Sequence, residues 1–160
     1  MGKRRMARGH ALKVMLVASS GGHLAQLVRL EPWYRHHDVR WVTFPLPDAV
    51  SLLSGADVVW AHHPTTRSIK NLIRNAVLAA REFRRSRPDL IVSCGAGVAV
   101  PFFWIGKLLG TRTVFVETFD RLDDRSMTAL LVSPVTDLFL VQSPRQMALY
   151  PGSHLIGALL

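Results

Sequence analysis

VMLVASSGGHLAQLVRL, residues 14–30, passes from a run of apolar, β-branched residues through two serines and two glycines into a helical pattern. The run before Ser19 is typical of a buried strand, and the leucines after His23 recur at the spacing of one helix face. Glycine at such a junction lets the chain turn tightly and approach a ligand closely. This stretch therefore predicts the first strand and helix of an α/β domain, with a ligand site at the turn between them.

Five more strand-like runs follow, each rich in β-branched or aromatic residues and bounded by Gly, Pro, Asp or Ser: residues 39–44, 57–62, 89–95, 111–117 and 137–142. Helical patterns lie between most of these runs. Apolar strands that alternate with helices predict a doubly wound, mostly parallel sheet covered on both faces, which is a Rossmann-like α/β fold. We expect one domain over residues 13–160, preceded by a mobile basic tail over residues 1–12.

The composition limits the classes of protein to which the chain can belong. With 160 residues, 49% of them apolar and 19% charged, it is expected to be a single globular domain. Its apolar runs are shorter than the roughly 20 residues of a membrane span. Cys94, the single cysteine, is predicted to be a buried structural thiol rather than a nucleophile. His62 and His63 precede a proline, and no His or Cys spacing suits a metal, so we expect neither a metal ion nor a cofactor.

Ligands of doubly wound sheets bind beyond the carboxyl ends of the strands, and the loops at those ends are informative here. They read SSGGH after the first strand, HHPTTR after the third, GAGVAVP after the fourth and ETFDRLDDRS after the fifth. We expect these loops to form one rim. A phosphate or diphosphate suits the helix N-terminus after Gly21 and Gly22. The turn is neither G-x-G-x-x-G nor G-K-[ST], so neither a dinucleotide site nor a P-loop is indicated.

Three side chains on this rim are candidates for chemistry. His23 lies in the first turn of the predicted helix, where an imidazole can act as a base near neutral pH or bind a phosphate. The alternative is a partly exposed neighbour of the helix cap. Glu117 ends the fifth strand and Arg121 follows in the next loop. For these two residues the alternative is an ordinary surface ion pair.

Residues 65–87 predict one long amphipathic helix. Its apolar residues at helical spacing form a predicted core-facing stripe: Ile69, Leu72, Ile73, Ala76, Val77, Ala80 and Phe83. Basic residues fall on the opposite side, within a band of roughly 60°: Arg67, Lys70, Arg74, Arg81 and Arg85. A solvated helix face normally mixes charges of both signs, so this ridge favours contact with an anionic surface.

The segment GVAVPFFWIGKLLG, residues 97–110, is apolar nearly all round. Such a helix is either deeply buried or meets lipid or a partner, and Phe102, Phe103 and Trp104 are its candidates for the second role. The formal net charge of +9 fits an anionic membrane or a nucleic acid. The basic helix beside an apolar one favours the membrane, and the chain lacks a recognised motif of exposed aromatic residues that stack on bases. We therefore expect no nucleic-acid partner.

Three stretches together resemble a known family: VMLVASSGGHLAQLVRL, DLIVSCGAGVAVPFFWIGKLLGTRTVFVET and SPVTDLFLVQSPRQMALYPGSHLIGALL, at residues 14–30, 89–118 and 133–160. The family is that of the Alg14-like oligosaccharide biosynthesis proteins, which are subunits of split GT-B glycosyltransferases. It includes the membrane-recruiting subunit of the eukaryotic transferase that adds the second N-acetylglucosamine to dolichol diphosphate, and bacterial capsule and exopolysaccharide counterparts. The chain is also similar to the N-terminal half of the peptidoglycan lipid-linked N-acetylglucosaminyltransferase, which shares the Gly-Gly-His turn.

The resemblance implies half of a GT-B enzyme in polysaccharide biosynthesis. This half would bind a polyprenyl-diphosphate-linked sugar acceptor, and a separate partner subunit would bind the nucleotide sugar. Since the chain ends at Leu160 without a second Rossmann-like half, we expect little or no activity from it alone. We also expect peripheral attachment to the cytoplasmic face of the plasma membrane.

The resemblance, taken with the residue patterns, suggests three sets of site residues. The predicted catalytic residues, which would take the proton of the acceptor hydroxyl, are His23 and Glu117. The predicted ligands of the acceptor diphosphate are Ser19, Ser20, Gly21, Gly22 and Arg121. The predicted membrane surface comprises Arg67, Lys70, Arg74, Arg81, Arg85, Phe102, Phe103 and Trp104.

The chain departs from the family pattern in three places. It lacks the N-terminal membrane helix of the eukaryotic members. The loop ETFDRLDDRS, residues 117–126, adds three aspartates beside the predicted diphosphate site, and VQSPRQ, residues 141–146, replaces an expected Val-Gln-Trp-Pro-Glu. A non-catalytic membrane scaffold that anchors a complete glycosyltransferase is the alternative function.

Overall fold

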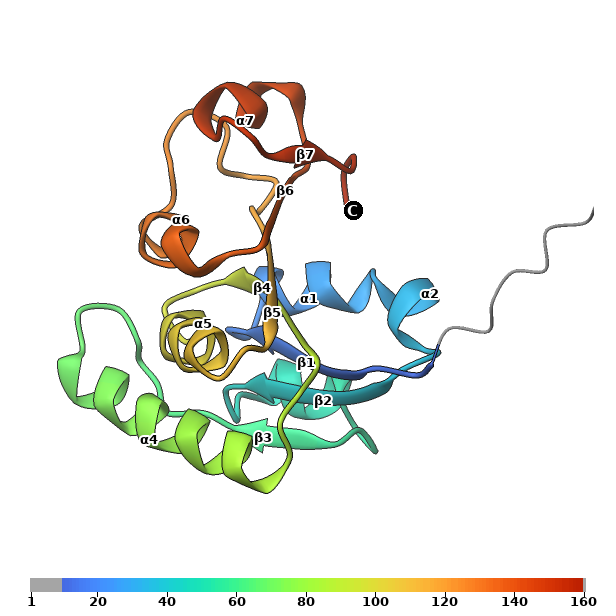
Figure 1. The fold of residues 1–160 in the computed structure, drawn as a ribbon, viewed down its shortest axis with the longest axis vertical. Coiled ribbons are helices and arrows are strands. Elements are labelled where there is room, and N and C mark those ends of the chain that lie inside the picture. Colours follow the sequence, from blue (N-terminus) through green and yellow to red (C-terminus); the bar gives the residue numbers. More distant parts are fainter. Residues whose placement is uncertain (1–9, 160) are drawn as a thin grey trace, which may run out of the picture.

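The strand that begins the 14–30 stretch lies near the middle of a parallel sheet. The computed structural model describes residues 10–159, so most of the predicted basic tail lies outside the described residues. Within them, seven strands form one sheet in the order β3-β2-β1-β4-β5-β6-β7, with every neighbouring pair parallel (Figure 1). The strands are β1 (Lys13–Ala18), β2 (Asp38–Thr43), β3 (Val58–Trp60), β4 (Leu90–Gly95), β5 (Arg112–Val116), β6 (Leu138–Val141) and β7 (His154–Leu155).

Helices connect these strands. They are α1 (Gly22–Val28), α2 (Glu31–Tyr34), α3 (Pro47–Leu52), α4 (Ile69–Arg85), α5 (Ala99–Leu108), α6 (Met127–Val132), the 3-10 turn η1 (Ser133–Val135) and α7 (Pro144–Leu149). The structure confirms the doubly wound parallel fold and all six predicted strands. Strand β7 has no recognisable sequence pattern, because its two residues are too few to show an alternation.

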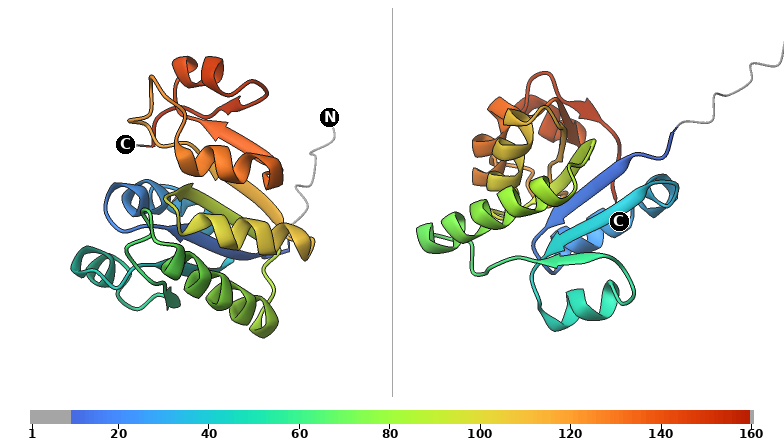
Figure 2. Two further views of the ribbon diagram at one scale, coloured as in Figure 1. Left: turned by 90° about the vertical axis from the view of Figure 1, so that its left-hand side faces the viewer. Right: turned by 60° about the horizontal axis from the view of Figure 1, so that its bottom comes forward.

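The strands alternate their side chains between two helical layers. Met15 and Val17 of β1 point into a core shared with α4, α5 and α6, whereas Val14 and Leu16 point into a core shared with α1 and α3. Figure 2 shows α4, α5 and α6 side by side on one face of the sheet. The sheet therefore has an apolar core on each side, as continuous apolar strands require.

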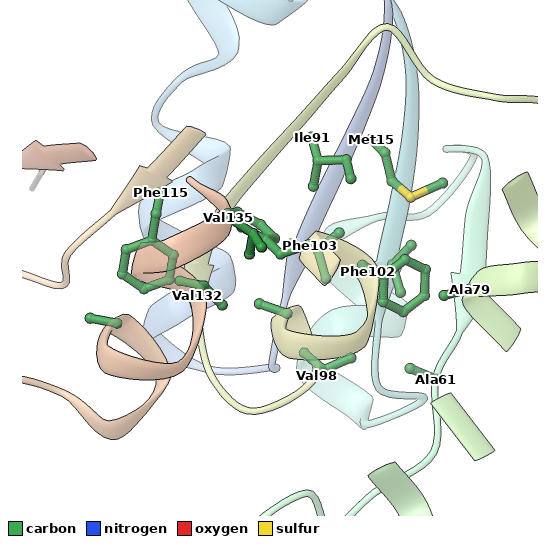
Figure 3. Close-up of a cluster of buried hydrophobic side chains, with 14 of the residues drawn as sticks. Met15, Ala61, Ala79, Ile91, Val98, Phe102, Phe103, Phe115, Val132 and Val135 are labelled. Carbon is green, nitrogen blue, oxygen red and sulfur yellow. The ribbon is translucent and has the colours of Figure 1, made fainter. Parts of the chain in front are cut away.

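The apolar helix α5 lies in the middle of the first core. Phe102 and Phe103 are wholly buried, and Phe103 packs edge-on against Phe115 of β5 with ring centroids 6.1 Å apart (Figure 3). The prediction that these two phenylalanines belong to the membrane surface is therefore wrong, because both belong to the buried core that α5 shares with the sheet, α4 and α6. Trp104 is exposed and donates a hydrogen bond from Nε1 to the Leu131 carbonyl at 3.0 Å.

Helix α4 begins at Ile69, capped by Ser68, and its orientation differs from the predicted one. The predicted core stripe is wrong for most of its length, since Ile69 is 75% exposed and Ile73 is 59% exposed. Leu72 and Val77 are exposed as well, and only Phe83 of the stripe is fully buried. The buried face instead carries Asn71, Asn75, Ala79, Glu82 and Phe83.

Hydrogen bonding explains this orientation. The Asn75 amide accepts from the His62 backbone N–H at 2.8 Å and donates to the His62 carbonyl at 2.9 Å. Asn71 donates to the Pro64 carbonyl at 2.8 Å. Buried backbone groups need such partners, so the polar face of α4 turns inward, toward the loop between β3 and α4.

The second face of the sheet is only partly covered by helices. Between α2 and the C-terminal segment, β4, β5 and β6 form the floor of an apolar groove of about 500 Å³. Its lining residues are Leu30, Trp33, Leu90, Val92, Val114, Val116, Leu138, Leu140, Ile156 and Leu159. Figure 1 shows α1 and α2 ending beside this part of the sheet rather than crossing it.

Candidate functional site

The four predicted loops meet in one cleft at the carboxyl ends of β1, β3, β4 and β5. The strand order reverses between β1 and β4, which is where sheets of this type bind ligands. The cleft encloses about 500 Å³. Its lining residues are His23, Thr65, Thr66, Arg67, Cys94, Gly95, Ala96, Gly97, Glu117, Thr118, Arg121, Ser126, Met127, Thr128 and Leu131. The predicted rim is thus confirmed as a shared cavity.

His23 lies in the first turn of α1 and lines this cleft. Its ring lies close to Gly95, where an added Cβ would be 3.3 Å from Cδ2 and 3.4 Å from Nε2. Gly95 has a φ of 104°, so this position suits glycine both for its backbone and for the space that it leaves to the imidazole. Burial lowers the pKa of His23, and Asp120 and Glu117 oppose part of that shift. The neutral imidazole is therefore favoured at pH 7.

Ser19 contacts the other nitrogen of His23. The Ser19 Oγ lies 3.1 Å from His23 Nδ1 and also donates to the Ser20 carbonyl at 3.3 Å. A hydroxyl has one proton, so when that proton goes to the carbonyl, the serine oxygen accepts from Nδ1–H. In that arrangement the proton of the neutral ring is on Nδ1, and Nε2 is free to accept a proton.

Glu117 lines the same cleft as His23, but its carboxylate is 1% exposed and fully engaged. Oε1 accepts from the Thr118 backbone N–H at 3.0 Å. Oε2 accepts from the Ser126 hydroxyl at 2.9 Å and from the Tyr150 hydroxyl. The structure thus brings the two predicted catalytic residues together, with the carboxylate held by three donors.

Two arginines supply positive charge to the cleft. Arg121 follows β5, and Arg67 precedes α4. Arg67 has a φ of 52°, a left-handed conformation that non-glycine residues adopt at a cost and that often marks functional sites. Arg67 was predicted as part of the membrane-facing ridge of the helix, but it precedes α4 in a non-helical conformation and lines the cleft instead.

The turn at residues 19–22 lies beside the cleft, and none of its residues lines it. Gly21 caps α1 with a φ of 76°, and its backbone N–H donates to the Asp48 carboxylate at 2.7 Å. An acidic side chain thus already occupies this part of the predicted anion site. Of the predicted diphosphate ligands, only Arg121 lines the cavity.

Exposed apolar side chains lie on the three neighbouring helices α4, α5 and α6. We call this set of side chains the outer face, and it comprises Ile69, Leu72, Ile73, Val77, Trp104, Leu108, Met127, Leu130 and Leu131. The basic residues Lys70, Arg74, Arg81 and Arg85 are exposed on the same helix α4. Met127 and Leu131 belong both to the outer face and to the cleft wall. In residues 10–159 no helix combines the length and the apolar character that crossing a membrane requires.

Helix α6 contributes to the cleft and was not among the predicted site elements. Met127, Thr128 and Leu131 form one wall of the cleft, and Ser126 caps the helix by accepting from the Ala129 N–H at 3.1 Å. A serine before an apolar run is a helix-start signal, so RSMTALL could have indicated this short helix. Cys94 is buried as predicted, and burial raises the pKa of its thiol. The described residues hold no cluster of His, Cys, Asp and Glu able to bind a metal ion.

The chain is similar in sequence to proteins of one known family. The profile of a family described as "Oligosaccharide biosynthesis protein Alg14 like" matches residues 59–159. The UDP-N-acetylglucosamine transferase subunit ALG14 of Eremothecium gossypii is 27% identical over 189 aligned positions, covering 99% of this chain and 84% of that protein. The human protein of the same name is 26% identical over 180 positions, covering 92% and 82%.

Solved structures show the same fold. MurG of Acinetobacter baumannii superposes with a TM-score of 0.69 at 20% identity, covering 91% of this chain and 44% of the MurG chain. The UDP-N-acetylglucosamine 2-epimerase of Rickettsia bellii gives a TM-score of 0.69 at 14% identity, covering 91% and 43%. This chain therefore spans less than half the length of these proteins, and its fold is one Rossmann-like half of the GT-B architecture.

Proposed function

The chain belongs to the Alg14-like family of oligosaccharide biosynthesis proteins, and from that premise we propose that it is the acceptor-binding, membrane-associated subunit of a two-chain glycosyltransferase. A partner subunit binds the nucleotide sugar, and the acceptor is a polyprenyl-diphosphate-linked sugar used in polysaccharide biosynthesis. One observation carries the proposal: a single cleft brings His23, Arg67 and Arg121 together and opens at an apolar outer face.

The chemistry follows from the position of His23. In the transfer, the acceptor hydroxyl oxygen bonds to the anomeric carbon of the donor sugar. The bond from that carbon to the nucleoside diphosphate breaks, and its electron pair leaves with the diphosphate. His23 Nε2 takes the hydroxyl proton, which a neutral imidazole with a lowered pKa can do at pH 7. Ser19 orients the ring by its contact with Nδ1.

The acceptor diphosphate binds to Arg67 and Arg121 in this proposal, rather than to the turn at residues 19–22. Both arginines line the cavity, whereas Asp48 already occupies the Gly21 N–H. A guanidinium matches phosphate oxygens with paired donors, so two of them suit a diphosphate. The strained backbone of Arg67 supports a binding role for that residue.

The outer face rests on the membrane in this proposal, and the attachment is peripheral, at the cytoplasmic face of the plasma membrane. Apolar side chains of α4 and α6 enter the interface, while Lys70, Arg74, Arg81 and Arg85 meet anionic head groups. Each basic residue contributes about 1 kcal/mol near such a surface. Since Met127 and Leu131 belong to both the outer face and the cleft, a lipid-linked diphosphate can enter without leaving the bilayer.

In this proposal a partner subunit supplies the half that binds the donor. The chain covers 44% of the MurG chain, which leaves more than half of that chain without a counterpart here. The relatives are named as subunits of a UDP-N-acetylglucosamine transferase, so UDP-N-acetylglucosamine is the first donor to test. The apolar groove over β4, β5 and β6 is the place where an apolar segment of the partner docks, because parallel sheets are normally covered on both faces.

Reconstitution tests this function. The chain is assayed with and without a candidate donor-binding subunit, using UDP-N-acetylglucosamine and other nucleotide sugars with a polyprenyl-diphosphate sugar in anionic vesicles. We expect transfer only when both chains are present. Full-rate transfer by the isolated chain would contradict the split arrangement, and transfer to a free sugar as fast as to the lipid-linked one would contradict the acceptor assignment.

A matched substitution separates a catalytic subunit from a scaffold. His23→Ala is expected to lower kcat by about 10²–10⁴-fold while the two chains still assemble. His36→Ala, on the exposed segment after α2, is the control and leaves kcat unchanged. If His23→Ala assembles normally and retains full turnover, the chain only anchors its partner.

A further inference from the structure

Tyr150 ties the beginning and the end of one cleft loop together from outside the cleft. The loop runs from residue 118 to residue 126 and carries Arg121. The Tyr150 hydroxyl accepts from the Ser126 backbone N–H at 2.9 Å and donates to Glu117 Oε2. Burial and the bond to Glu117 raise the pKa of Tyr150, so the hydroxyl keeps the proton that it donates. Ser126 is also the cap of α6, so the same contacts set the start of the cleft wall.

Gln146 holds the first half of the same loop. Its side chain is fully buried, and Nε2 donates to the Thr118 carbonyl at 2.7 Å and to the Arg121 carbonyl at 3.0 Å. Oε1 accepts from the backbone N–H groups of Gln142 and Ser143, at 2.8 and 3.2 Å. All the hydrogen-bonding capacity of this amide therefore goes to backbone, and half of it goes to the loop that carries Arg121.

Both residues belong to α7 or its end, and neither lines the cleft. Tyr150 stacks on Phe139 of β6 with ring centroids 4.6 Å apart, and this packing fixes its position relative to the sheet. The loop itself has mainly exposed side chains and few internal bonds, from the Arg121 N–H to the Thr118 carbonyl and from the Leu122 N–H to the Asp120 carbonyl, both 3.2 Å. Its conformation thus depends on α7.

We propose that Tyr150 and Gln146 are positioning residues that hold the 118–126 loop and thereby place Arg121 and the first turn of α6 around the cleft. Glu117 belongs to the same framework, because its carboxylate is the acceptor that Tyr150 and Ser126 share. On this view Glu117 positions the loop, and His23 alone takes the proton. The inference rests on the proposed function where it concerns acceptor binding by Arg121, and on contacts alone where it concerns the loop.

Two conservative variants test the proposal in the assembled two-chain enzyme. Tyr150→Phe keeps the ring and its stacking and removes only the hydroxyl. Gln146→Glu keeps the acceptor for Gln142 and Ser143 and removes both donors to the loop. Met147→Ala, an exposed position on the same helix, is the control. Amide hydrogen exchange of the peptide covering residues 118–126 is measured first, and steady-state kinetics with the lipid-linked acceptor second.

We expect exchange in this peptide to become about tenfold faster in both variants and to stay unchanged in Met147→Ala. The acceptor KM should rise about three- to tenfold, with a smaller change in kcat and an unshifted pH profile. Unchanged exchange in Tyr150→Phe and Gln146→Glu would overturn the proposal. If Arg121→Ala raises the acceptor KM, then faster exchange with an unchanged KM in these two variants would overturn it as well. If Arg121→Ala leaves KM unchanged, the assigned role of Arg121 in acceptor binding fails, and the exchange data still decide whether α7 holds the loop.

Discussion

The protonation state of His23 depends on the residues that surround its imidazole. Its ring is enclosed by Gly95 on one side and is contacted by Ser19 on the other. Burial lowers the pKa, so the neutral base is present throughout the physiological range. Gly95 thus leaves space for the imidazole, and Nε2 is available when the Ser19 hydroxyl donates to the Ser20 carbonyl and accepts from Nδ1–H.

The pH dependence of turnover should report this lowered pKa. As the pH falls through the pKa of His23, which lies below the ordinary 6.5, the imidazole takes up a proton and can no longer accept one from the acceptor. We expect kcat of the assembled enzyme to reach a plateau above pH 6.5 and to fall below it. His23→Gln should remove this dependence along with most of the activity, and a wild-type profile that falls already above pH 7 would contradict the assignment.

Gly95→Ala should affect both the backbone and His23. With a φ of 104°, an alanine is strained by about 1–3 kcal/mol, and its Cβ presses on the imidazole. Gly55→Ala is the matched control, because Gly55 has a φ of 83° and nothing within 4 Å of an added Cβ. Both variants should lose stability in urea unfolding. Only Gly95→Ala should also lower kcat, and equal kcat in the two variants would show that the imidazole has room to move.

Helix α4 shows how an element can be identified correctly and oriented wrongly. The helix has an apolar stripe and a polar stripe, and both follow the helical period. The polar stripe is buried because the side-chain amides of Asn71 and Asn75 hydrogen-bond to the backbone of the β3–α4 loop. Arg40 reinforces that side by contacting Glu82 at 3.1 Å and Asp57 at 2.8 Å. The apolar stripe was thereby left on the outer face.

Stability measurements can distinguish the two orientations of α4. Asn75→Ala leaves the backbone N–H and carbonyl of His62 without partners and should cost about 1–3 kcal/mol. Ile73→Ala removes an exposed side chain and should change the free energy of unfolding by less than about 0.5 kcal/mol. Urea denaturation compares the two variants directly. A larger loss for Ile73→Ala would favour the orientation predicted from periodicity.

Vesicle sedimentation tests whether the same stripe inserts into membranes. The double variant Ile69→Ser and Ile73→Ser should weaken binding to vesicles that contain anionic phospholipid, because apolar burial in the interface is lost. Val50→Ser with Leu52→Ser, at exposed positions of α3, is the matched control and should bind as the wild type. Raised salt should weaken the remaining, electrostatic binding. Equal binding by both double variants would contradict insertion by α4.

In the whole molecule, helices cover one face of the sheet and leave part of the other face open. The α4–α5–α6 side is packed, and the opposite side leaves the groove over β4, β5 and β6 open. The groove shares no lining residue with the cleft or with the outer face, so in the proposed function a partner can dock there while the acceptor and the membrane are bound.

Substitution in the groove should weaken assembly without unfolding the chain. Leu138→Asp places a charge on the groove floor, where a docked partner would bury it, and we expect the dissociation constant to rise at least about tenfold. Leu52→Asp introduces the same charge at an exposed position of α3 and is the control. Isothermal titration calorimetry with the partner subunit measures both. Equal affinities would place the interface elsewhere.

The sequence alone was sufficient to predict the parallel sheet and the four loops around one cleft, and to recognise the family resemblance. Strand alternation, helix period and glycine turns arise from residues that are neighbours in the chain, so they can be recognised without the fold. Tertiary contacts decided the rest: that Phe102 and Phe103 are core, that Ile69 and Ile73 are exposed, and that Asp48 occupies the Gly21 amide. Burial and hydrogen bonding between segments distant in sequence depend on which surfaces meet in the folded chain, and local periodicity does not specify that.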